Sequence, residues 1–64
     1  MMAYSLTSVQ VAGPPPTSHG NERAIVMLRG ERVALDRGDV SYAGWLQLCA
    51  AVRGDTVKLM LRDA

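Results

Sequence analysis

The chain has 64 residues, of which 48% are hydrophobic, and its seven basic and six acidic side chains leave a formal net charge of +1. This length allows one small domain over residues 1–64 with a core that is only marginally sufficient for folding. The composition argues against a disordered chain, and the balanced charge argues against a broad basic field for nucleic acid or lipid.

Cysteine usage and the first residues bear on location. Cys49 is the only cysteine, which excludes an internal disulfide and favours a reducing compartment. The first five residues lack the basic start and apolar run of a signal peptide, and no stretch is long enough to span a bilayer. We therefore expect a cytoplasmic protein without a membrane segment.

The first predicted element is a strand over residues 4–11, which are rich in Ser, Thr and Val. Its alternation is imperfect, because Leu6 falls on the opposite face from Val9 and Val11. A bulge near Ser8 would reconcile the pattern, and so would an edge strand with one weakly buried side.

A proline-rich surface loop is expected next, over residues 13–22. Its three consecutive prolines remove backbone donors and favour extended geometry, so this segment can form neither a helix nor a sheet ladder.

A β-hairpin follows the loop. The unbroken apolar run 24–28 predicts a strand covered on both faces, and residues 32–35 return as its partner. A turn at residues 30–31 would set Leu28 opposite Val33. It would also place two like charges, Arg29 and Arg32, opposite each other, so a slightly longer loop is equally compatible with the sequence.

Residues 41–54 predict a short helix whose start is capped by Asp39 or Ser41 and whose end is closed by Gly54. Its apolar stripe consists of Trp45, Leu48, Cys49 and Val52, widened by Tyr42 and Leu46. The reverse side carries the small residues Ala43, Gly44, Ala50 and Ala51 together with Gln47. Such a side allows close approach of another chain.

The last predicted strand covers residues 56–62, in which apolar residues alternate with Lys58, Met60 and Arg62. The fold class is therefore α+β: a small single-layer mixed or antiparallel sheet of three to four strands, with one helix packed on one face, in the order β-β-β-α-β. A right-handed crossover would set the last strand parallel to the third if they share a sheet. The face without the helix would hold Ile25, Met27 and Met60.

No catalytic, cofactor or metal site is expected. His19 lies in the proline-rich loop without other ligands at metal-binding spacing, and Cys49 lies within the apolar stripe without a neighbouring base. A small enzyme built on either residue is a third hypothesis, which requires a pocket and an activating neighbour.

Two surfaces are candidates for binding. We expect self-association, as a homodimer, through the helix face of Gly44, Gln47 and Ala51. We expect a target to be bound by the hairpin arginines, Arg23, Arg29 and Arg32, which should cluster at one end of the predicted hairpin. Both expectations rest on the small size of the chain, which leaves few side chains to cover two apolar layers.

The function that these features favour is that of a non-enzymatic intracellular binding protein. It would act as an inhibitor or accessory regulator through protein contacts, of the kind that phages and other mobile elements encode. The alternative is a nucleic-acid-binding regulator that presents the hairpin arginines to phosphates. The chain offers few aromatic residues for base stacking, which favours the first hypothesis.

Overall fold

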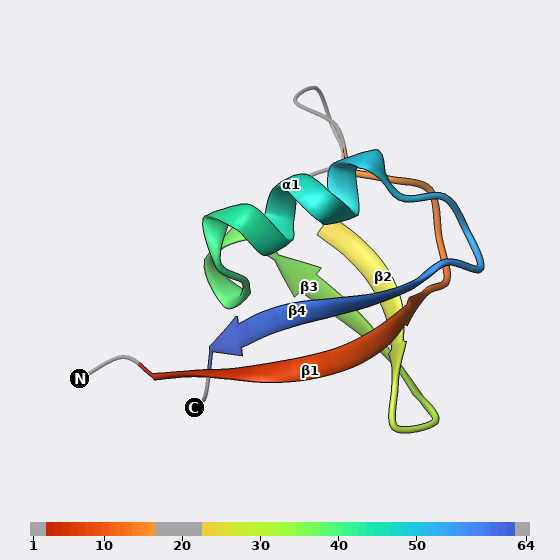
Figure 1. Cartoon of the computed structure of the whole chain (residues 1–64). Coiled ribbons are helices and arrows are strands. Elements are labelled where there is room, and N and C mark those ends of the chain that lie inside the picture. Colours follow the sequence, from red (N-terminus) through yellow and green to blue (C-terminus); the bar gives the residue numbers. More distant parts are fainter. Residues whose placement is uncertain (1–2, 17–22, 63–64) are drawn as a thin grey trace.

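The computed structural model describes residues 3–16 and 23–62, to which the statements below refer. In chain order they form β1 (Tyr4–Val11), β2 (Arg23–Leu28), β3 (Glu31–Asp36), the short 3-10 turn η1 (Arg37–Asp39), α1 (Tyr42–Ala50) and β4 (Thr56–Arg62). The strands make one open antiparallel sheet in the order β3-β2-β1-β4, and α1 lies across one of its faces (Figure 1). The predicted α+β class and element order are confirmed.

The predicted parallel placement of the last strand is wrong. β4 pairs antiparallel with β1 from Tyr4↔Arg62 to Gln10↔Thr56, at the edge of the sheet farthest from β3. This pairing sets Val9 and Leu59 on the face under α1, where both are almost fully buried. The helix therefore connects the two outer strands rather than two neighbours.

The sheet consists of two long ribbons that share a short contact. β1 pairs with β4, and β2 with β3, along nearly their whole lengths, whereas β1 and β2 pair only at Gln10↔Met27 and Val11↔Val26. In Figure 1 the hairpin of β2 and β3 runs across the direction of β1 and β4. The core lies between α1 and the concave side of these ribbons, with Leu48, Leu59, Val9 and Val26 at its centre.

β1 contains no bulge. Its register with β4 is continuous, so the side chain of Leu6 simply lies on the face of the sheet opposite to Val9 and is 65% exposed. The alternative, a strand with one weakly buried side, describes β1 correctly, although β1 is an edge strand only in its first half.

The hairpin turn is formed by Arg29 and Gly30, with φ angles of 52° and 81°. Positive φ at both central residues is typical of the type I′ turn, whose twist matches that of paired strands. The predicted register is therefore wrong: Leu28 lies opposite Glu31, and Val33 lies opposite Val26.

The helix is shorter than predicted and is rotated about its axis. Ser41 caps its start, where the side-chain oxygen accepts a hydrogen bond of 3.2 Å from the N–H of Gly44. It ends at Ala50, because Ala51 turns to extended backbone and is buried in the core. Gly54 lies beyond the helix at a φ of 97°, in the turn before β4.

The predicted proline-rich loop is described only over residues 13–16, and residues 17–22 lie outside the described residues. Its beginning packs onto the protein, because Gly13 and Pro16 are buried while Pro14 and Pro15 are exposed. A Cβ atom on Gly13 would lie 3.0 Å from the Cβ of Ile25, so the start of the loop is in close contact with β2.

Candidate interaction surface

The face of the sheet opposite to α1, here called the outer sheet face, has no helix over it among the described residues. Strand alternation places five large apolar side chains on it, namely Tyr4, Leu6, Ile25, Met27 and Met60. Leu6 is 65% exposed and lies next to Met60, which is 38% exposed. The prediction that Ile25, Met27 and Met60 lie on the face without the helix is confirmed.

The outer sheet face also carries an excess of positive charge. Alternation places the basic side chains of Arg23, Arg32, Lys58 and Arg62 there, against the one acidic side chain of Asp36. The other described charges balance, with three basic residues and three acidic ones, Arg29, Arg37, Arg53, Glu31, Asp39 and Asp55. Among the described residues, the excess positive charge therefore belongs to this face.

Register shows how the two kinds of side chain are mixed. Lys58 lies opposite Ser8, two register pairs along from Leu6↔Met60 and therefore next to them on the same face, and Arg32 lies opposite Met27. Uncharged polar groups and apolar groups thus separate the two cations. This arrangement suits a partner that offers both carboxylates and apolar side chains.

The hairpin arginines do not form one cluster. Arg29 and Arg32 lie at the turn end of the hairpin, whereas Arg23 begins β2, roughly 20 Å away along the strand. The prediction of one three-arginine cluster is therefore corrected, because β2 spans the whole interval between Arg23 and Arg29. Target binding by any of the three stays a prediction.

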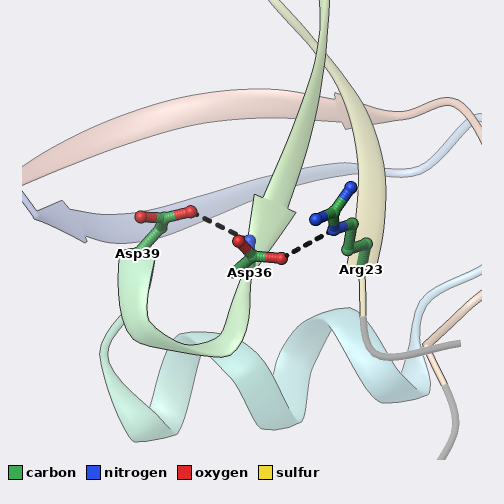
Figure 2. A network of polar contacts seen from close by, with 3 residues as sticks. All are labelled: Arg23, Asp36 and Asp39. Atoms are coloured by element: carbon green, nitrogen blue, oxygen red, sulfur yellow. Dashed lines mark hydrogen bonds and ion pairs between the residues drawn. The ribbon is translucent and has the colours of Figure 1, made fainter.

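Arg23 belongs to a local network with the residues before the helix. Its Nε donates a hydrogen bond of 3.0 Å to Oδ1 of Asp36, and the backbone N–H of Asp36 donates to Oδ2 of Asp39 at 2.9 Å (Figure 2). Both members of the ion pair are mostly exposed, so water screens the attraction and the pair contributes little to stability. Arg23 therefore lies beside η1, at the end of the hairpin far from Arg29 and Arg32.

The predicted self-association face is divided between the interior and the surface. Gly44 and Ala51 are buried in the core, and Gln47 is exposed. A Cβ on Gly44 would lie 2.7 Å from Cγ1 of Val40, so glycine here permits contact within the chain. The placement of Gly44 and Ala51 on the outward side is wrong, whereas self-association itself stays a prediction.

The outward side of α1 instead carries residues that had been assigned to the core. Tyr42 is 77% exposed, Leu46 is 50% exposed, and Cys49 is exposed as well. Trp45 and Leu48 are the members of the predicted stripe that are buried. The helix is rotated about its axis relative to the predicted stripe, since the buried residues 44, 45 and 48 also lie on one side of a helix.

The described part of the chain holds no group of three or more His, Cys, Asp and Glu residues that could bind a metal ion. His19 lies outside the described residues. Cys49 makes no hydrogen bond to an acidic or basic side chain within residues 3–16 and 23–62. No helix in that part of the chain has the length and apolar character needed to cross a membrane.

Comparisons with protein-family models, with curated proteins and with solved structures found no match to this chain.

Proposed function

We propose that this chain is a non-enzymatic binding protein that acts as an inhibitor or accessory regulator by docking the outer sheet face on another protein. The observation that supports the proposal is the coincidence, on one face without a helix over it, of exposed Leu6 and Met60 with the cations Lys58 and Arg32, which form no ion pair among the described residues. Large exposed apolar side chains that gather on one face mark interaction sites.

The charge distribution favours an acidic partner. Complementary charge raises the rate of encounter and rejects wrong partners, while the apolar side chains supply the buried area. Lys58 and Arg32 flank the apolar residues, as polar groups flank the centre of many protein interfaces. We therefore expect a target surface in which carboxylates surround a small apolar centre.

A matched pair of charge reversals tests this function. Wild-type chain, Lys58→Glu and Arg53→Glu are immobilised, and proteins captured from an extract of the source organism are compared. Lys58 lies on the outer sheet face, and Arg53 lies in the exposed turn after α1. Wild type and Arg53→Glu should retain a protein that Lys58→Glu loses, and the purified partner should bind Lys58→Glu at least about tenfold more weakly. Equal binding to all three would contradict the proposal.

The second candidate is nucleic-acid binding, which the placement of Arg29 and Arg32 at one hairpin end favours. It predicts binding of generic DNA or RNA that weakens steeply as salt is raised, because phosphate contacts release counterions. Fluorescence anisotropy with labelled oligonucleotides at low and moderate ionic strength measures this. Absence of binding at low salt would reject the candidate.

A further inference from the structure

The first half of β1 has an open edge. Val11 accepts a hydrogen bond from the N–H of Gly54 at 2.7 Å and donates one to the carbonyl of Asp55 at 2.8 Å, on the side of β4. Backbone groups alternate in direction along a strand, so the N–H and C=O groups of even-numbered residues point the other way, toward β2. Gln10 finds its partner there in Met27, the last pair before β2 ends.

Beyond that pair, nothing in the described part of the chain continues the ladder. The backbone N–H and C=O groups of Tyr4, Leu6 and Ser8 point to the side where β2 would lie, and no described strand or loop pairs with them. In Figure 1 this half of β1 runs along the lower left of the molecule, and β2 meets β1 only near its other end. This half of β1 is thus an open strand edge, in which the backbone groups of these three residues have no hydrogen-bond partner among the described residues.

The other two edges of the sheet are protected. β3 carries Glu31, Arg32 and Asp36, and charges on an edge strand oppose pairing with another chain. The outer edge of β4 is occupied at Met60 and Leu61 by the segment before α1, through the bridge Val40↔Leu61 and a hydrogen bond of 3.0 Å from the N–H of Ser41 to the carbonyl of Met60, and it carries the charge of Lys58 farther along.

β1 has none of these protections. Residues 4–11 contain no charge, no proline and no bulge, and Leu6 projects beside the open edge with 65% of its surface exposed. An uncharged, regular and exposed edge strand is a template for pairing with a further strand. In native proteins, an exposed sheet edge can bind a further strand through main-chain hydrogen bonds.

We propose that a second copy of this chain pairs with this edge, β1 against β1 in antiparallel orientation about a twofold axis at Leu6. This register sets Leu6 of one copy opposite Leu6 of the other, and Tyr4 opposite Ser8. It is the symmetric register that gives partners to all three open residues, since hydrogen-bonded pairs exchange both of their bonds. Two sheets then join into one.

Self-pairing suits this edge because β1 brings no like charges together. An isologous contact brings the same strand of both copies together, so a strand carrying charges of one sign would repel its copy, and the uncharged β1 does not. The outer sheet faces of the two copies become continuous, with the two Leu6 side chains adjacent at the centre. The inference goes beyond the proposed function, since it concerns the edge of β1 and not the cations of the outer face.

Opposite charges at position 6 provide the test. Leu6→Lys and Leu6→Glu each place like charges on the twofold axis and should weaken dimerisation by about tenfold or more, whereas an equimolar mixture of the two should restore it. Ala34→Lys, an exposed position on the outer face of β3, is the control and should dimerise as wild type does. Sedimentation velocity over a concentration series measures each.

Amide hydrogen exchange provides a second readout on the unmodified chain. With rising protein concentration, the amides of Tyr4, Leu6 and Ser8 should become protected, while those of Thr7 and Val9, which already point to β4, should not change. A wild-type chain that stays monomeric into the millimolar range, a dimer that neither charge at position 6 weakens, or protection at other amides would overturn the inference. Lys58→Glu should leave dimerisation intact, so failure here is separate from failure of the proposed function.

Discussion

Replacing Gly44 by alanine tests which side of α1 faces the core. The added Cβ would lie 2.7 Å from Cγ1 of Val40 and 3.4 Å from Cδ2 of Leu59. Val40 is itself buried, and its branched side chain has little freedom to move aside. The core must therefore shift to accept one methyl group.

Two effects of opposite sign decide the outcome. Overpacking a tight core costs about 1–3 kcal/mol, and exchanging glycine for alanine inside a helix gains about 1 kcal/mol. We expect a net loss in the free energy of unfolding of about 1 kcal/mol. If Gly44 lay on the exposed side, as the sequence pattern had indicated, the same change would stabilise the chain by about 1 kcal/mol.

Urea denaturation at low protein concentration, followed by the fluorescence of Trp45, measures this difference. Gln47→Ala, on the exposed side of the same helix, is the control and should change the free energy of unfolding by less than about 0.5 kcal/mol. A clear stabilisation by Gly44→Ala would refute the assigned orientation of the helix.

Three further predictions concern the hairpin turn, the helix surface and the core. Arg29→Asn should stabilise the chain by up to about 1 kcal/mol in urea denaturation, because asparagine tolerates the φ of 52° better than arginine, and a loss would argue against the type I′ turn. Cys49 should react with a thiol reagent in the folded state at close to the rate of the unfolded chain, whereas strong protection would show that Cys49 is buried. Arg37→Ala should cost about 0.5–1 kcal/mol and shift the emission of Trp45 to longer wavelength, because the guanidinium lies 5.8 Å from the ring centre, and an unchanged spectrum would refute that contact.

Local patterns in the sequence predicted the elements well. The alternation of residues 56–62 and the apolar run 24–28 each match a strand, and the alternation of 56–62 defines its buried side correctly. The strand of the run 24–28 was predicted to be covered on both faces, but α1 covers only one of them. The class of fold follows from the order of these elements. The pairing between distant strands could not be predicted from local patterns. The pairing of β1 with β4 depends on how the two ribbons pack around the core residues Leu48 and Leu59.

The helix shows why its rotation was predicted wrongly from a sequence of nearly uniform composition. Nearly every residue of α1 is apolar or small, so several stripes have similar periodicity, and the pattern alone cannot set the rotation. Close packing selects one of them: Gly44 fits against Val40, where a larger residue does not. Gly44 was the available signal in the sequence for close approach of a neighbour. That neighbour is Val40 of the same chain and not a second chain.

The open edge of β1 could have been suspected from its sequence but not located. Residues 4–11 lack charge and proline, as central strands do. That β2 ends after Leu28 while β1 continues beyond it depends on the register and on the turn at Arg29 and Gly30. The edge is thus a property of the tertiary arrangement.

The exposure of Leu6 and Met60 on the outer sheet face, within one copy of the chain, is the claim on which the account depends most. Paramagnetic relaxation of methyl groups by a soluble gadolinium chelate, measured on dilute monomeric protein, tests it most directly. The methyl groups of Leu6 and Met60 should relax strongly, while those of Leu48 and Leu59 should be nearly unaffected. Equal protection of all four would show that the chain covers this face itself and would contradict the account.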